Sequence, residues 1–336
     1  WLRERNIPFQ SDHAGEAYGG NGRNIVAFVK GNTKERPLGF AAHMDQIEPC
    51  RNVNPVINGN IISTDKTTTL GGDDKAGISA IMEAVEDIIE SGVPHRDIYL
   101  VFTCSEEISM MGTKHMDMSM LPCKELVVVD ATGGAETLAY KAPAMEAIEI
   151  TFKGKKAHAG IEPEKGINAI VVASKAISKM HIGRIDYETT SNIGHIEGGS
   201  ATNIVTDEVT FTAEIRSHSM EKLAAEVTHM EQCCKEAVEE MGACYEMKHE
   251  MAYPVLSLEE DCELIQDTVN AMAEERITAN KMIIGGGSDA NVLAGHGYKS
   301  VILGCGMINV HTVEEALDTD ETWKVTKVLR RLMGAE

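Results

Sequence analysis

Carboxylate and imidazole side chains recur in this chain, mostly just after short apolar runs that are predicted to be strands. In chain order they are His43, Asp45, Asp73, Asp74, Glu106, Glu107, Asp130 and His311. Nitrogen and oxygen donors of this kind suit Zn²⁺ or another borderline divalent cation, and no thiolate is required. Each motif is weak alone, because a strand-end His or a solvated acidic loop has an ordinary structural explanation. Their co-occurrence predicts a metal site.

The spacing of the donors adds detail. His43 and Asp45 lie two residues apart at a strand end and therefore face the same side, where the carboxylate can steady the imidazole. Paired carboxylates such as Glu106-Glu107 repel each other unless a cation is present or a pKa is raised. Asp73 and Asp74 precede a predicted helix, where one Asp is a good N-cap and two exceed what capping needs. One of these two is therefore a candidate to bridge metals.

Apolar patterning predicts a mostly parallel α/β sheet that presents these donors at its carboxyl edge. Ligands of open α/β sheets bind at that edge. The predicted strands are 25–29, 38–42, 98–103, 126–129 and 300–303, and the predicted helices are 76–90, 264–273 and one from Asp320. A Gly-rich turn is predicted at 285–289.

A second pattern interrupts the first. Predicted strands at 147–152, 193–196, 208–215 and 243–248 and helices at 167–180 and 222–241 follow the order βαββαβ, which is the ferredoxin-like unit. The expected organisation is an α/β domain, residues 1–142 and 252–336, with an inserted α+β domain, residues 143–251.

Composition limits the class of partner. Lys and Arg number 31 against 52 Asp and Glu, a formal charge of −21 that repels nucleic acids and anionic membranes. No apolar run approaches the roughly 20 residues that span a bilayer. Eight Cys without a CxxC pair indicate reduced thiols. We therefore expect a cytoplasmic protein with no nucleic-acid or membrane partner.

The chain resembles the two-zinc exopeptidases, a family that includes peptidase T, aminoacylase, glutamate carboxypeptidase and succinyl-diaminopimelate desuccinylase. The likeness covers nearly the whole chain and is closest to the peptidase T-like branch. It is carried by HMDQIEP, GGDDKAGISAIMEA, SEEISMMGTK, KAHAGIEPEKGINAI, GGSATNIVTDEVTFTAEIRSH and GGGSDANVLAGHG. The resemblance implies hydrolysis of small peptides by a zinc-exopeptidase α/β domain, with an inserted lid and dimerisation domain that makes a homodimer.

The resemblance also implies roles for single residues. Two Zn²⁺, or Co²⁺ or Mn²⁺ in their place, would be bridged by Asp73, with a cis peptide at Asp73-Asp74, while Asp45 orients His43 and Glu106 is the general base. The ligands would be His43, Asp73 and Asp130 for one ion and Asp73, Glu107 and His311 for the other. Substrate contacts would come from His158, Asn203 and Arg216. Ser288 and Asp289 would contact the substrate from the Gly-rich turn. Gly285 stands where peptidase T has Arg, which removes one cationic substrate anchor.

Three functions compete. The leading hypothesis is a metal-dependent aminopeptidase that releases residues from small peptides. An N-acyl amino acid amidohydrolase or a carboxypeptidase of the same family is the alternative enzyme. A catalytically silent relative that binds peptides or acts as a scaffold is the alternative of another class, and the intact donor set with Glu106 argues against it.

Overall fold

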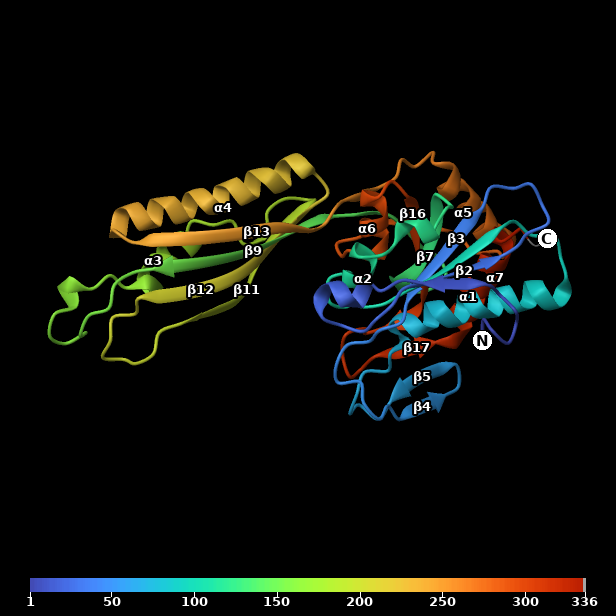
Figure 1. Cartoon of the computed structure of the whole chain (residues 1–336), viewed down its shortest axis with the longest axis horizontal. Coiled ribbons are helices and arrows are strands. Elements are labelled where there is room, and N and C mark those ends of the chain that lie inside the picture. The colour runs from blue at the N-terminus through green and yellow to red at the C-terminus, as the bar shows by residue number, and fades with distance from the viewer. Residues whose placement is uncertain (335–336) are drawn as a thin grey trace. The chain divides into compact units, whose positions relative to one another are not determined.

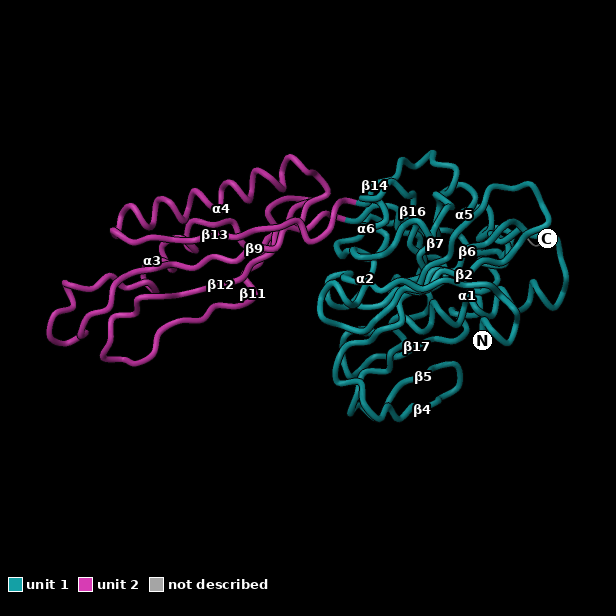
Figure 2. Tube along the Cα trace, in the orientation of Figure 1, with its two compact units in different colours: residues 1–142, 256–336 teal, residues 143–255 magenta. Residues whose placement is uncertain are grey.

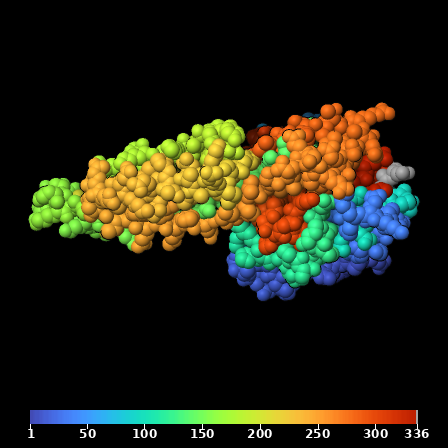
Figure 3. Space-filling model, turned by 90° about the horizontal axis from the view of Figure 1, so that it is seen from above, coloured from blue at the N-terminus to red at the C-terminus, as the bar shows by residue number. Residues whose placement is uncertain are grey.

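The computed structural model describes residues 1–334, and the chain divides into two compact units (Figure 1, Figure 2). Unit 1 comprises Trp1–Ala142 and the chain from Leu256 on, and unit 2 comprises Pro143–Val255. The predicted boundary after residue 251 falls inside strand β13, Cys244–Tyr253, so unit 2 continues to Val255. Early (blue) and late (red) residues share the surface of unit 1 (Figure 3).

The centre of unit 1 is a block of parallel strands within a 12-stranded sheet of the described residues. Side by side, these strands are β6 (Ile98–Thr103), β3 (Leu38–His43), β7 (Glu125–Thr132) and β16 (Lys299–Ile308). The predicted α/β class is confirmed, and parallel pairing holds for this central block.

Most flanking strands of the sheet pair antiparallel, although β15 pairs parallel with β8, so the sheet as a whole is mixed. Short strands in hairpins leave a weak pattern in the sequence, and most of these elements were not predicted. The flanking strands are β1 (Phe9–Ser11), β2 (Ile25–Val29), β4 (Pro55–Asn58), β5 (Ile61–Thr64), β8 (Thr137–Ala142), β14 (Leu256–Ser257), β15 (Asn280–Ile283) and β17 (Ala316–Asp318).

Helices cover both faces of this sheet because its central strands are apolar on both sides. Successive residues of β3 point to opposite faces, so Phe40 packs in one core cluster and Ala41 in the other. The first cluster contains α1 (Gly72–Ser91), α5 (Glu263–Glu274) and α7 (Thr319–Leu332), and the second contains α6 (Asp289–Gly295). Shorter helical turns are η1 (Ala14–Tyr18), α2 (Met111–Lys114) and η2 (Met118–Met120).

Unit 2 is a five-stranded antiparallel sheet in the order β10-β11-β12-β9-β13, which is the predicted βαββαβ arrangement with β10 added at one edge. Its two longer helices pack on one face of the sheet (Figure 1). The elements are β9 (Ala144–Lys153), η3 (Pro163–Lys165), α3 (Ala169–Ile177), β10 (Gly183–Arg184), β11 (Thr189–Gly198), β12 (Glu208–Ser217), α4 (Met220–Met241) and β13.

All eight Cys are free thiols, and most of them are buried. Burial raises the pKa of Cys123 and of Cys234 to about 12, so these two thiols stay protonated and act as small apolar side chains.

Within residues 1–334, no helix combines the length and the apolar character needed to cross a membrane.

Phe152 tests the core of unit 2. The side chain is fully buried, with its ring centroid 6.1 Å from that of Phe211. We expect Phe152→Ala to lower the free energy of unfolding of this unit by about 3–5 kcal/mol, because it leaves a cavity. Urea denaturation of the full chain, followed by circular dichroism, measures the loss. Tyr187→Ala, at a side chain 83% exposed, is the control, and a loss below about 1 kcal/mol for Phe152→Ala would contradict this core.

Candidate metal centre

The predicted donors meet at the carboxyl edge of the parallel strands of unit 1. His43 is the last residue of β3, and Asp130 lies near the end of β7. Glu106 and Glu107 follow β6, and His311 follows β16. Because neighbouring parallel strands end at the same edge, residues far apart in the sequence become neighbours there. The register pairs Leu38 with Ile98 in β3 and β6 and so brings both strand ends together.

Asp73 lies at the centre of the cluster, at the N-terminal end of α1. Its Oδ1 is 2.8 Å from His43 Nε2, and its Oδ2 is 3.2 Å from His311 Nε2. Asp130 Oδ1 lies 3.6 Å from the same nitrogen of His43. Glu107 Oε2 lies 2.9 Å from the same nitrogen of His311. The arrangement therefore consists of two donor sets, each with one imidazole and one further carboxylate, which share Asp73.

Asp74 differs from Asp73 in how its carboxylate is used. It is fully buried, and its oxygens accept hydrogen bonds from the backbone N–H groups of His43 (3.2 Å) and Gly77 (3.1 Å). One of its oxygens lies within 4.8 Å of donors of His43 and Asp130. Only Asp73, however, faces both imidazoles. The Asp73-Asp74 peptide bond is cis, which confirms that expectation from the resemblance.

Asp45 connects His43 to the loop that carries both glutamates. Its two carboxylate oxygens accept hydrogen bonds from the backbone N–H groups of Glu106 (3.0 Å) and Glu107 (3.1 Å). Its Oδ1 lies 3.5 Å from His43 Nδ1, which is a close charge contact and longer than a good hydrogen bond. One carboxylate thus holds a strand end and a loop in register.

The cluster carries more negative charge than its surroundings neutralise. Burial, together with nearby Asp74, raises the pKa of Asp130. Burial, with the charges of Asp130 and Asp289, likewise raises the pKa of Glu106. Burial alone would lower the pKa of His43, but its contacts with Asp45 and Asp73 raise that pKa instead.

The cluster also contains a buried oxygen without a hydrogen-bond partner, Glu107 Oε1. A divalent cation supplies both the missing charge and the missing partner, since carboxylate oxygens and imidazole nitrogens are its usual ligands. The residues present therefore fit a pair of divalent cations that share Asp73.

A cavity of about 390 Å³ opens beside the cluster. Its lining includes the ionisable residues Asp73, Glu106, Asp130 and His311 and the apolar residues Met282, Ile284 and Val310. Ser288 also lines the cavity, and its hydroxyl caps α6 by accepting a hydrogen bond from Ala290 N–H (3.2 Å). The volume suits a small ligand.

Asp289 corrects a sequence expectation. The residue was expected to contact substrate from the Gly-rich turn, but it is buried, and its carboxylate accepts hydrogen bonds from the hydroxyls of Thr113 (2.6 Å) and Thr103. Its oxygens are therefore engaged inside the protein. Neither threonine was predicted as a partner, because the two lie 176 and 186 positions away along the chain.

The remaining predicted substrate residues belong to unit 2. His158 and Asn203 are exposed neighbours there, since Ala159 N–H donates to the Asn203 carbonyl (2.9 Å). Arg216 forms an ion pair with Glu214 (2.9 Å) and lies opposite Met145, near the start of β9. His158 follows the other end of β9. That end, Lys153, lies roughly 26 Å from Met145 at about 3.3 Å per residue. Unit 2 therefore brings His158 and Asn203 together but separates Arg216 from them.

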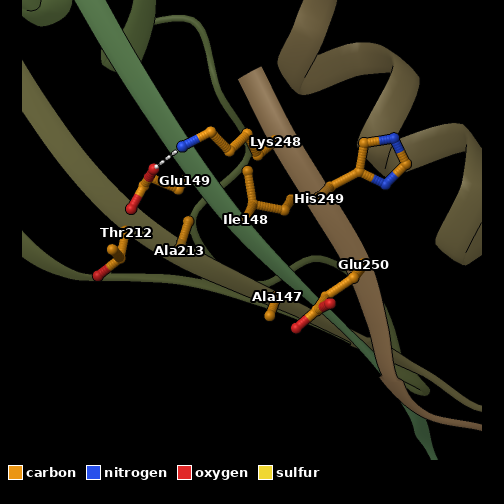
Figure 4. Close-up of a pocket in the computed structure, with 8 residues that line it drawn as sticks. All are labelled: Ala147, Ile148, Glu149, Thr212, Ala213, Lys248, His249 and Glu250. Atoms are coloured by element: carbon orange, nitrogen blue, oxygen red, sulfur yellow. Dashed lines mark hydrogen bonds and ion pairs between the residues drawn. The ribbon is translucent and has the colours of Figure 1, made fainter. Parts of the chain in front are cut away.

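A second cavity, of about 480 Å³, lies on the sheet of unit 2 (Figure 4). Its Lys and His side chains already have partners, Lys248 with Glu149 (3.0 Å) and His249 with Glu146 (3.1 Å). In the part of unit 2 that the structure describes, no three potential metal donors converge. Both groups of converging donors that the structure describes belong to unit 1.

One buried residue near the centre was not predicted. The carboxylate of Glu315 accepts hydrogen bonds from backbone N–H groups of the turn that leads to Asp73. An acidic residue in an irregular loop carries no periodic signal, and its distance of four positions from His311 is the only hint in the sequence.

Comparisons with known proteins show that the chain is similar to peptidases. A model of the peptidase dimerisation domain matches residues 145–242, and a model of M42 glutamyl aminopeptidase matches residues 53–160. The chain is 38% identical to an uncharacterized protein, YqjE, of Bacillus subtilis (strain 168), over 96% of this chain and 87% of that protein. It is 26% identical to a peptidase T of Escherichia fergusonii, over 88% of this chain and 80% of the relative.

Solved structures of peptidases are also similar to this chain. Aminopeptidase PepT of Bacillus cereus superposes with a TM-score of 0.92, and a tripeptidase of Staphylococcus aureus with 0.95. Each is 33% identical to this chain and covers 99% of it and 89% of the solved chain. The YXEP protein of Bacillus subtilis, a dinuclear metal-binding peptidase from the M20 family, shares the fold at 16% identity, with a TM-score of 0.73 over 100% of this chain and 90% of that one.

Asp45 tests the support around His43. We expect Asp45→Asn to weaken divalent-metal binding by about 10–100-fold, the usual cost of losing a partner behind a ligand, because an amide cannot accept both backbone N–H groups and face His43 as well. Zn²⁺ titration of the metal-free protein against a chromophoric chelator measures the change. Asp65→Asn, in an exposed turn, is the control. Equal affinity in Asp45→Asn and the control would reject this role.

Proposed function

This chain belongs to the M20 metallopeptidase family, in its peptidase T-like branch, and from that premise we propose that it is a dinuclear metal aminopeptidase acting on small peptides. The observation that carries the proposal is the position of Asp73, whose two oxygens face the imidazoles of His43 and His311. That arrangement suits a carboxylate bridge between two cations. The 33% identity to an aminopeptidase and a tripeptidase supports peptide substrates.

The proposed ligands follow from the two donor sets. His43, Asp73 and Asp130 would hold one ion, and Asp73, Glu107 and His311 the other. Zn²⁺ is the proposed metal, and Co²⁺ and Mn²⁺ accept the same donor types. When bound, such ions polarise a carbonyl oxygen and make a water molecule acidic enough to act as a nucleophile near neutral pH.

Glu106 is the proposed general base. It lines the cavity next to Asp73 and Asp130, within the space where a substrate would meet the metals. A carboxylate whose pKa is raised by burial accepts a proton from the attacking water and then delivers it to the departing amine. Asp45 holds the backbone of this residue in place.

Substrate contacts and assembly complete the proposal. Ser288 lines the cavity, and His158, with Asn203 and Arg216, is proposed to contact the substrate, His158 at the developing oxyanion. Unit 2 is the proposed homodimer interface, because the dimerisation-domain model matches residues 145–242. Eight free thiols fit a cytoplasmic location.

Glu106 and Glu107 are adjacent but have different proposed roles, which gives a matched pair of variants. We expect Glu106→Gln to retain its metal and to lose about 10²-fold or more in kcat, the lower range for a general base. Glu107→Gln should instead lose metal from the protein, because it removes a ligand. Elemental analysis and kcat measured on the same preparations separate the two effects. Unchanged turnover in Glu106→Gln would reject its role as base.

The free amine of the substrate distinguishes the competing functions. We expect hydrolysis of unblocked tripeptides and at least a tenfold lower kcat/KM for the same tripeptides after N-acetylation, because an aminopeptidase recognises the amine. Product analysis by mass spectrometry identifies the residue released. Preference for the acetylated forms would favour an amidohydrolase, and release of the C-terminal residue a carboxypeptidase. Peptide binding without turnover in the metal-loaded protein would indicate a silent relative.

A further inference from the structure

A single buried carboxylate lies under the turn that presents Asp73. Glu315 is 2% exposed. Its Oε2 accepts hydrogen bonds from the backbone N–H groups of Leu70 (2.7 Å) and Gly71 (2.9 Å), and its Oε1 accepts one from Asp73 N–H (2.9 Å). Three backbone donors from four consecutive residues therefore converge on one side chain, which fixes the backbone of the turn around an anion.

The turn needs this support because its backbone is irregular. Gly71 has a φ of +77°, in the left-handed region, and Asp73 has φ −80° and ψ 105°, outside the helical range although it lies within α1. The N–H groups of such residues have no intrahelical acceptor. A Cβ placed on Gly72 would come within 3.2 Å of Glu315 Oε1, so the carboxylate packs closely against the turn.

The same carboxylate belongs to the loop that carries His311. Glu315 follows His311 by four residues, and its own N–H donates to the Thr312 carbonyl (3.2 Å). The Thr312 hydroxyl in turn donates to the Asn309 carbonyl (2.8 Å). The side chain of His311 is 55% exposed, so its position depends on the backbone of this short loop more than on packing around the ring. A loop fixed at Glu315 is therefore also fixed near His311.

We propose that Glu315 is a positioning residue for the metal pair: it ties the turn of Asp73 to the loop of His311 and so sets the spacing of two ligands of one ion. The inference rests on the proposed dinuclear site. His311 Nε2 and Asp73 Oδ2 are 3.2 Å apart, on segments separated by more than 200 positions. Glu315 connects these two segments directly, through its bond to Asp73 N–H.

The test compares neighbouring residues of the same loop. Glu315→Gln keeps the shape but turns an amide NH₂ toward at least one of the three backbone donors, which displaces the turn. Glu314→Gln is the control, because Glu314 is 54% exposed and pairs only at the surface, with Lys66. Metal-free full-length protein is titrated with Zn²⁺ and, separately, with Co²⁺. Binding stoichiometry, the two affinities, the Co²⁺ absorption spectrum and the thermal unfolding of each variant are recorded.

We expect wild type and Glu314→Gln to bind two ions with the same affinities. Glu315→Gln should bind one of the two ions about 10–100-fold more weakly, with an altered Co²⁺ spectrum, as is usual when a group behind a ligand is lost. Its kcat should fall at limiting metal and recover partly in excess metal, with KM little changed. A residue that served only general stability would lower the unfolding temperature without these changes.

A second variant covers the case in which Glu315→Gln does not fold. Glu315→Asp keeps the charge but shortens the side chain by one methylene, so it cannot reach all three donors and should show the same selective weakening. Wild-type binding of both ions in either folded variant overturns the proposal for Glu315 alone. If wild type itself binds fewer than two ions, the proposed dinuclear site fails instead.

Discussion

The main physical constraint on the site of unit 1 is the repulsion between carboxylates that the fold brings together. Asp73, Asp74, Glu106, Glu107 and Asp130 gather around His43 in a largely buried space. Like charges interact strongly where water is excluded, and the five carboxylates outnumber the two imidazoles of His43 and His311. Burial, together with the neighbouring carboxylates, raises the pKa of Asp130 and of Glu106. Bound cations would allow all of these groups to ionise together, which explains why a fold would retain so costly a cluster.

The acidic residues near the centre divide into two groups by their partners. Asp45, Asp74 and Glu315 accept backbone N–H groups and so hold strand ends, a helix start and loops in place. Asp73, Glu106 and Asp130 instead line the cavity, and Glu107 keeps a buried oxygen without a partner. The first group shapes the site, and the second remains available for ions, water and substrate. Preorganisation of this kind lowers the reorganisation that binding and catalysis require.

Much of this site was predictable because strand ends are visible in the sequence. Apolar runs followed by His43, Glu106 and Asp130 mark the edge of a parallel sheet, and the structure places these residues together. The choice between Asp73 and Asp74 was not predictable from spacing, because adjacent residues differ only in direction. That choice came from the family resemblance, and the structure gives a physical reason for it in the backbone partners of Asp74.

Other features were hidden because they depend on tertiary contacts. Glu315 and Asp289 are acidic residues of irregular segments, and their partners lie on distant parts of the chain. The separation of Arg216 from His158 follows from the length and register of β9, which motif matching does not reveal. Apart from β2, which was predicted, the flanks of the large sheet consist of short strands whose patterns are too brief to recognise.

The most direct test of the account is anomalous diffraction from crystals of the Zn²⁺-loaded protein, recorded on both sides of the zinc absorption edge. The account predicts two peaks that flank the carboxylate of Asp73, one beside His43 and Asp130 and the other beside His311 and Glu107. A single peak, or two peaks that do not share Asp73, would contradict it.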